Sequence, residues 1–182
     1  MKKTISIIIS IAMCAMLASC GGVKNEVSDT EQPTLIDTMS LEEKVGQILF
    51  VRCVDDEQTD DLMSIKPGGI LMFGRDFEGL TKDEVKEKIQ SYQDKSDIPL
   101  IIGADEEGGT VVRVSSNPNL APEKFKSPQE IYNEGGMDAV VENATEKSEL
   151  LLSLGVNMNL APVADVSTNP SDYMYDLSLI HI

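Results

Sequence analysis

Two carboxylates close together in the chain have the types and the spacing for acid–base work on a glycosidic bond. Asp105 and Glu107 follow the apolar run Leu100–Ile102 after a Gly103-Ala104 step. If the backbone stays extended there, the two side chains share a face and their Cα atoms lie about 6.5–7 Å apart. Glycosidases use such a pair, one carboxyl as proton donor and the other as nucleophile or base. The spacing offers Asp105 and Glu107 as candidate acid and base, and a solvated acidic loop with an ion pair fits it equally well.

The residues after this pair suit a ligand-binding turn. Gly108 and Gly109 let the backbone turn sharply and leave room for a ligand beside it. Arg113 follows a few residues later, and its guanidinium can return to bind hydroxyl groups or to clamp a carboxylate.

The composition argues against several classes of partner and site. The 182 residues carry 15 Lys and Arg against 31 Asp and Glu, a formal net charge of −16. Nucleic-acid binding needs a basic face, so we expect no nucleic-acid partner, and electrostatic docking on anionic lipid is disfavoured for the same reason. The one histidine, His181, lies at the extreme C-terminus, which argues against a His-rich metal site or a complete Ser-His-Asp triad. We predict neither a metal nor another cofactor.

Helical and extended patterns alternate from Thr34 onward. Capping boxes at Ser40–Glu43 and Thr81–Glu84 predict two helix starts, and further helices are expected over 55–64, 127–131 and 138–154, the last ending at Gly155. Apolar runs over 48–51, 69–74, 98–103 and 156–160 predict short strands. In the first helix, Leu41, Val45 and Ile48 form an apolar face. In the later helices, the predicted inward positions are Val85, Ile89, Val141, Ala144, Leu150, Leu151 and Leu154.

Continuous apolar strands between amphipathic helices are typical of a parallel sheet covered on both faces. A doubly wound sheet and a barrel both fit this α/β pattern. No G-x-G-x-x-G follows the first strand, so the best evidence for a dinucleotide-binding fold is missing. In either architecture polar chemistry collects at the carboxyl ends of the strands, where Asp105 and its neighbours fall.

The first twenty residues predict export and lipid attachment. Lys2 and Lys3 precede an apolar run from Ile5 to Ala18, which is too short to cross a bilayer as a helix. The sequence LASCG around Cys20 resembles the lipobox of bacterial lipoproteins, in which the cysteine is acylated after cleavage. We expect residues 1–19 to be a lipoprotein signal peptide and residues 20–33 a flexible tether, with Cys20 carrying the lipid. The predicted location is extracytoplasmic and membrane-anchored, and an ordinary signal peptide with a chance cysteine is the alternative.

Four ordered motifs resemble one known family. Residues 105–113 (DEEGGTVVR) resemble the D-x-E-G-G-x-V-x-R motif of glycoside hydrolase family 3, in its β-N-acetylhexosaminidase branch. Segments 39–47, 68–74 and 159–166 agree in order and spacing, so the resemblance covers residues 34–176. The β-glucosidase branch usually carries D-G-P where this chain has Glu107–Gly109, which favours the hexosaminidase branch. The resemblance implies an α/β fold made of about the first four βα units of a (β/α)8 TIM-type barrel.

The resemblance also changes the roles of the acids. In the family, the residues matching Asp105 and Arg113 bind the sugar and do not attack it. We assign Asp165 to the substrate-binding residues as well, and expect it to support its strand end rather than to do chemistry. The nucleophile is another Asp and the acid/base a His, both after a Lys-His motif that this sequence lacks, so we predict no catalytic residue here. The implied substrate is terminal β-linked N-acetylglucosamine, from a glycan or cell-wall fragment, hydrolysed through a covalent intermediate without a metal.

The tail departs from the family pattern. Members usually continue Asn-Pro…Arg-Ser-Phe-Gly, but after Asn169-Pro170 this chain has Leu177 and Ile180 at the Arg and Gly positions. We therefore predict that residues 177–182 are foreign to the family. We also predict that the chain is a truncated, inactive piece of the hydrolase with unpaired strand edges and a bare apolar face. The alternatives are a natural short variant, a non-catalytic carbohydrate-binding lipoprotein, and a β-glucosidase of the same family.

Overall fold

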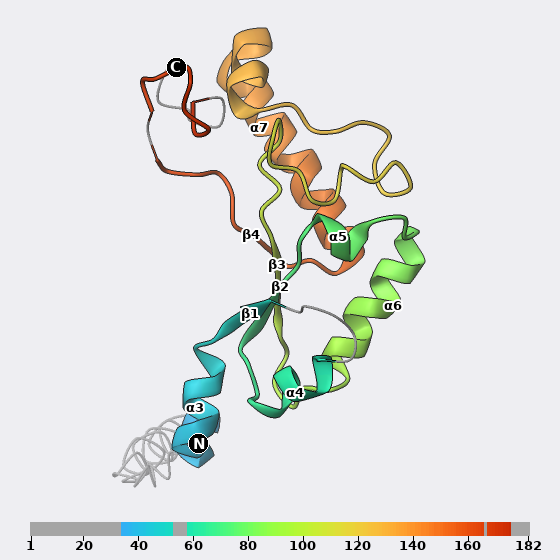
Figure 1. The fold of residues 1–182 in the computed structure, drawn as a ribbon, viewed down its shortest axis with the longest axis vertical. Helices are drawn as coiled ribbons and strands as arrows, with labels where there is room; N and C mark the ends of the chain where they lie inside the picture. The colour runs from blue at the N-terminus through green and yellow to red at the C-terminus, as the bar shows by residue number, and fades with distance from the viewer. Residues whose placement is uncertain (1–33, 53–57, 166, 176–182) are drawn as a thin grey trace, which may run out of the picture. The chain divides into compact units, whose positions relative to one another are not determined.

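The computed structural model contains a parallel four-stranded sheet (Figure 1). The structure describes residues 34–52, 58–165 and 167–175. The predicted signal peptide, tether, Cys20 and tail 177–182 lie outside the described residues. The chain divides into two compact units, 1–38 and 39–182. In the first, the described part contains one short helix, α2 (Leu35–Thr38), whose start is closed by the Asp37 carboxylate accepting from Thr34. All other described elements belong to the second unit.

The strands run in chain order across the sheet, β1-β2-β3-β4, and each pairs with its neighbour in parallel. Their bounds are Phe50–Arg52 for β1, Gly69–Leu71 for β2, Ile101–Ala104 for β3 and Met158–Asn159 for β4. All four fall in or directly beside the predicted apolar runs, and they are shorter than those runs. The predicted parallel α/β architecture is confirmed.

Helices connect successive strands, as parallel pairing requires. Helix α3 (Leu41–Gln47) precedes β1, α4 (Thr59–Ser64) precedes β2, and α5 (Gly74–Phe77) and α6 (Lys82–Gln93) lie between β2 and β3. The capping boxes predicted at Ser40–Glu43 and Thr81–Glu84 are both present. Each serves two otherwise unpaired amides, which fixes where α3 and α6 begin.

Helix α7 (Pro128–Leu154) joins β3 to β4 and contains a break. Gly135 and Gly136 have non-helical backbone angles, so the element consists of two helices, close to the predicted 127–131 and 138–154. Gly155 ends it in the left-handed conformation with φ of 93°, as predicted. The predicted inward positions Val141 and Ala144 are wrong, since both are exposed.

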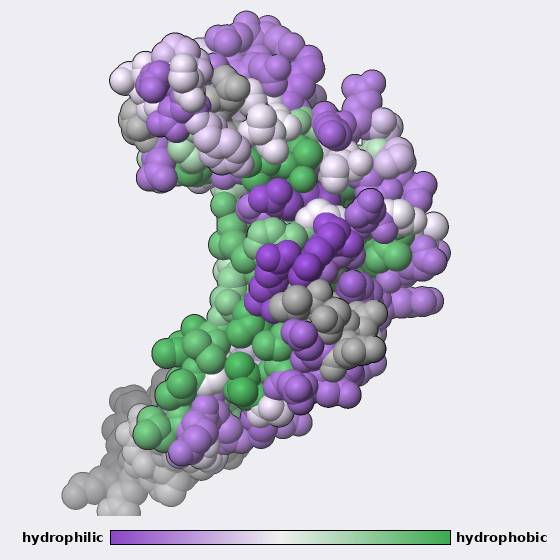
Figure 2. All heavy atoms as spheres, viewed as in Figure 1, coloured by the Kyte–Doolittle hydropathy of each residue, from purple (hydrophilic) through white to green (hydrophobic). Residues whose placement is uncertain are grey.

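The two faces of the sheet have different surroundings. The in-register partners Val51, Ile70 and Ile102 face the side of helices α6 and α7, and a core forms there with Val85, Ile89, Leu151 and Leu154. Phe50, Ile101 and Met158 lie on the opposite face and are partly exposed. Figure 2 shows the hydrophobic surface that continues from this face toward α3, where Leu41, Val45 and Ile48, the residue directly after the helix, are also exposed. We call these the helix-covered face and the open face.

On the open face, glycines make room for the ring of Phe50. A Cβ on Gly69 or on Gly103 would lie 2.5 Å from atoms of that ring. The aromatic ring can therefore lie across β2 and β3 only because neither strand has a side chain there.

Among the described residues, no helix combines the length and the hydropathy needed to span a membrane.

Candidate active site

The predicted pair Asp105–Arg113 meets at the carboxyl end of β3. The guanidinium donates from Nε to Oδ1 and from Nη2 to Oδ2 of Asp105, both at 2.6 Å. This bidentate geometry is the strong form of an arginine–carboxylate contact. The hydrogen bond to Asp105 raises the pKa of Arg113 above its ordinary value. About a quarter of each side chain is exposed, so the pair is fixed in place and still accessible to a ligand.

Phe73, just after β2, lies beside this pair. The Arg113 guanidinium carbon is 5.6 Å from the centroid of the Phe73 ring, and that of Arg52, at the end of β1, is 4.3 Å away. Three consecutive strand ends thus contribute to one edge, where an aromatic ring lies close to two cations.

Glu106, between the two predicted acids, has a structural role. Its side chain is fully buried, and Oε2 accepts from the amides of Arg113 at 2.6 Å and of Val114 at 2.7 Å. Oε1 accepts from the amide and the hydroxyl of Ser115. A buried carboxylate with several donors closes the loop from 106 to 115, and this loop returns Arg113 to Asp105.

The Gly108-Gly109 turn is required by close backbone approach. Gly108 has a φ of +106°, and a Cβ there would lie 2.1 Å from the carbonyl oxygen of Lys126. Gly109 has a φ of +60°, and its amide donates to the carbonyl of Phe125 at 2.9 Å. The prediction of a sharp glycine turn is confirmed, but the room beside it is filled by the 125–127 segment of the chain.

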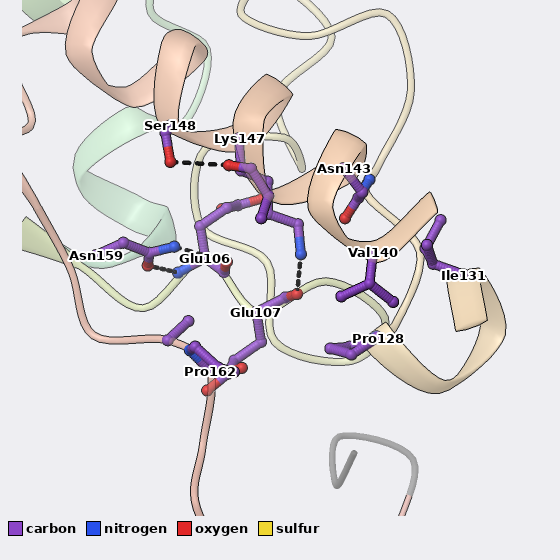
Figure 3. A pocket seen from close by; sticks show the side chains of 12 residues that line it. Glu106, Glu107, Pro128, Ile131, Val140, Asn143, Lys147, Ser148, Asn159 and Pro162 are labelled. Atoms are coloured by element: carbon purple, nitrogen blue, oxygen red, sulfur yellow. Dashed lines mark hydrogen bonds between the residues drawn. The ribbon is translucent and has the colours of Figure 1, made fainter. Parts of the chain in front are cut away.

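Glu107 has partners different from those of Asp105. Its Oε2 accepts from the amide of Val163 at 3.2 Å, on the segment after β4. Burial raises the pKa of the Glu107 carboxyl, against the lowering effects of the Val163 hydrogen bond and of Lys147. The Lys147 ammonium, on α7, donates to the main-chain carbonyl of Glu107 (Figure 3). Asp105 and Glu107 therefore do not act as one pair with a shared partner.

A cavity of about 150 Å³ lies between this turn and α7. Its polar lining comes from six residues: Glu106, Glu107, Asn143, Lys147, Ser148 and Asn159. Asn159, in β4, receives a hydrogen bond from the Glu106 amide at 3.0 Å and donates to the Glu106 carbonyl at 3.2 Å. The amide side chain thereby continues the hydrogen bonding between the two strands beyond Ala104, the last residue of β3.

Of the predicted substrate-binding residues, the structure brings Asp105 and Arg113 together. Asp165 is exposed on the segment after β4, two residues beyond the Val163 amide that contacts Glu107. Sequence reasoning missed Glu106, Lys147 and Asn159 as parts of the site. Strand alternation could have placed Glu106 on the buried side, since Ile102 and Ala104 precede it at two-residue intervals.

The arrangement can hold a polyhydroxylated ligand. A fixed carboxylate accepts hydrogen bonds from hydroxyl groups, and the guanidinium has donors beyond the two used on Asp105. A preorganised donor–acceptor pair of this kind at the carboxyl end of a parallel sheet is typical of binding sites in α/β barrels.

The family model described as the glycosyl hydrolase family 3 N terminal domain matches residues 40–176. Beta-hexosaminidase A of Pseudoalteromonas piscicida is 31% identical over 108 residues, which cover 58% of this chain and 18% of that protein. Beta-hexosaminidase of Haemophilus influenzae is 23% identical over 113 residues, covering 62% of this chain and 32% of that protein. The chain thus spans less than a third of the length of these curated relatives.

The crystal structure of a glycosyl hydrolase of the GH3 family from Mycobacterium smegmatis superposes with a TM-score of 0.63 at 23% identity. The match covers 78% of this chain and 42% of that one. The sheet described above is therefore part of a TIM-like α/β fold, as the family resemblance implies.

Proposed function

Because the chain belongs to the glycosyl hydrolase family 3 N-terminal domain family, we propose that it carries the sugar-binding part of a β-N-acetylhexosaminidase. The substrate is a glycan or cell-wall fragment ending in β-linked N-acetylglucosamine, and the reaction is hydrolysis of that terminal bond. Two relatives named as beta-hexosaminidases support the choice of branch.

The Asp105–Arg113 pair is the observation that carries this proposal. It lies at the carboxyl end of β3, where α/β barrels bind their substrates, and its bidentate geometry leaves both groups partly exposed. In the proposed role, Asp105 accepts hydrogen bonds from sugar hydroxyls and Arg113 donates to them. Contacts that strengthen as the ring distorts toward the oxocarbenium-like transition state contribute to rate as well as to binding.

The chemical step needs two further groups. The resemblance assigns the nucleophile to a different aspartate and the acid/base to a histidine, on segments that follow a Lys-His motif. This 182-residue sequence contains no such motif, and its one histidine is His181. The proposal for this chain is therefore limited to binding and orienting the sugar.

The test uses the product of the intact gene, assayed on an aryl β-N-acetylglucosaminide and on an aryl β-glucoside. We expect turnover of the first, and a loss of about 100-fold or more in kcat/KM for Asp105→Asn, as for other polar contacts made in a transition state. Asp138→Asn, an exposed aspartate on α7, is the matched control and should keep full activity. Preference for the glucoside would refute the substrate assignment.

The second candidate is a surface protein that binds carbohydrate without hydrolysing it. The observation in its favour is that the described site offers the Asp105–Arg113 pair for binding, while the neighbouring carboxylates of Glu106 and Glu107 accept structural hydrogen bonds from main-chain amides. Binding of N-acetylglucosamine by the intact gene product, lost in Asp105→Asn but without turnover, would establish this function instead.

Membrane anchoring through Cys20 is a proposal from the sequence alone. One thiol carries the lipid in that proposal, so Cys20→Ser should abolish labelling by a radioactive fatty acid in the native host. Cys53→Ser is the matched control and should label as the wild type does. Equal labelling of Cys20→Ser and the wild type would refute the lipobox interpretation.

A further inference from the structure

Lys147 has a charged side chain at a position where helix α7 faces the core. The helix buries Leu151 and Leu154, four and seven residues later, and Lys147 shares their face. Only 7% of Lys147 is exposed, and lysine is almost never so buried unless it has a partner.

The partner is the main chain of the acidic turn. Figure 3 shows Lys147 reaching from α7 to the carbonyl oxygen of Glu107, while the Glu107 side chain points away toward Pro162. The carboxylates of Glu106 and Glu107 act on the ammonium, opposing the lowering of its pKa by burial. Its Nζ also lies 5.6 Å from the centroid of the Phe125 ring. The Lys147 side chain thus contacts both the turn after β3 and the 125–127 segment from its position on α7.

Packing alone does not account for a charge at this position. An unbranched apolar residue of similar length would fill the space without the desolvation penalty, and such replacements of buried charges are often neutral or stabilising. What an apolar residue cannot do is donate to the Glu107 carbonyl. That carbonyl lies two residues after Asp105, within the loop that Glu106 closes onto the amide of Arg113.

We propose that Lys147 is a positioning residue for the Asp105–Arg113 pair. By holding the Glu107 carbonyl it fixes the turn from 105 to 109, and it places the sugar-binding pair without touching the sugar. The expected effect of Lys147 on activity rests on the proposed function. Its expected effect on the geometry of the turn rests on the Lys147–Glu107 contact alone.

The test compares variants at Lys147 in the intact gene product. Lys147→Met keeps the length and loses the donor, and Lys147→Gln keeps a neutral donor. Lys147→Arg keeps the charge and the donors, and Lys44→Met, an exposed helical lysine, is the matched control. We expect Lys147→Met to melt within a few degrees of the wild type and to lose about 100-fold in kcat/KM, as for a displaced catalytic geometry. Lys147→Gln and Lys147→Arg should recover about tenfold of that loss.

A double-mutant cycle separates positioning from a merely structural role. If Lys147 acts through the Asp105–Arg113 pair, Asp105→Asn combined with Lys147→Met should be no slower than Asp105→Asn alone. Additive losses, or wild-type activity of Lys147→Met, would overturn the proposal. If Lys147→Met fails to fold, Lys147→Gln replaces it in the same cycle.

A spectroscopic measurement keeps the inference independent of the enzyme assay. The NMR signal of the Arg113 Nε–H reports its hydrogen bond to Asp105 directly. It should shift in Lys147→Met and stay unchanged in Lys44→Met. An unchanged Arg113 signal in Lys147→Met would refute positioning, whereas a shifted signal in a protein without turnover would refute the proposed function alone.

Discussion

The two faces of the sheet show how one strand separates stability from function. Ile101 and Ile102 are adjacent in β3, yet Ile101 is 42% exposed on the open face and Ile102 is fully buried against the helices. The alternation continues past the strand end, where Asp105 is partly exposed and Glu106 is completely buried. Residues on the helix-covered side hold the structure together, and the partly exposed acid is the one that solvent can reach.

The open face corresponds to the side that a closed barrel packs with inward-pointing side chains. In TIM barrels, layers of such residues from alternate strands fill the interior. Here Phe50, Ile101 and Met158 provide apolar side chains of that kind, and they are partly exposed. The comparison predicts that substitutions on the two faces will differ strongly in how much they lower the free energy of unfolding. The following experiments test that difference, in decreasing order of expected effect.

Glu106→Ala should be the most destabilising change. It leaves the amides of Arg113, Val114 and Ser115 without their acceptor in a buried loop, so we expect a loss of about 4 kcal/mol in the free energy of unfolding. Urea denaturation measures it. Glu142→Ala, an exposed glutamate on α7, should be nearly neutral. Equal costs for the two variants would mean that the buried carboxylate does not hold the loop.

Ile102→Ala against Ile101→Ala is the matched test of the two faces. Removing three carbons from the packed side should cost about 3 kcal/mol, as for other buried isoleucines, because a cavity remains. The same change at Ile101 should cost less than about 1 kcal/mol. Both are read from urea denaturation of the same preparation. Similar costs would break the comparison, since the open face would then be packed in solution.

Hydrophobic dye binding tests the exposure of the open face in the 182-residue chain. We expect dye fluorescence to rise on binding, because the apolar surface that runs from this face to α3 is accessible. Ile101→Thr should reduce the fluorescence, and Ile102→Val should not change it. The absence of dye binding by the wild-type chain would show that this surface is covered, and would contradict the predicted bare face.

Glu107→Gln should have the smallest effect, visible as a change in pH dependence. Burial raises the Glu107 pKa in the folded chain, so the folded state holds this proton more tightly than the unfolded state does. The Glu107 contribution to stability is therefore greatest below the unfolded pKa of about 4.3 and decreases as pH rises toward the folded pKa. Glutamine can still accept from Val163 and does not titrate, so the variant should gain stability relative to the wild type as pH rises from about 4 through the folded-state pKa of Glu107. A parallel pH profile for both proteins would contradict the shift.

The local signals of the sequence predicted the elements well. The capping boxes at Ser40 and Thr81 and the glycine stop at Gly155 depend on hydrogen bonds within a few residues, so they can be read without tertiary structure. The Asp105–Arg113 contact also follows from a short loop with two glycines. The barrel and the proposed sugar-binding role of the pair come from the family resemblance rather than from the spacing.

Long-range contacts account for what the sequence reasoning missed. Val141 and Ala144 fit an apolar pattern but are exposed, while Lys147 is buried because of a carbonyl forty positions away. A periodicity argument weighs only apolar residues, so it cannot place a lysine in the core. The spacing of Asp105 and Glu107 is that of a catalytic dyad, so it favours the outer pair over Glu106.

The asparagines in and beside β4 have a consequence for how this strand finds its register during folding. Asn157 accepts from the amide of Ile102 and donates to the carbonyl of Leu100, and Asn159 makes the equivalent pair of bonds to Glu106. These bonds join residues 53 to 57 positions apart, the type of non-local contact that forms slowly. A strand of two residues has few ladder bonds with which to choose its alignment, and a slip by one residue would reverse every side chain. The two amide side chains therefore specify the register of β4. When β4 docks after the long α7 crossover, only the correct pairing with β3 satisfies the hydrogen bonds of both asparagines.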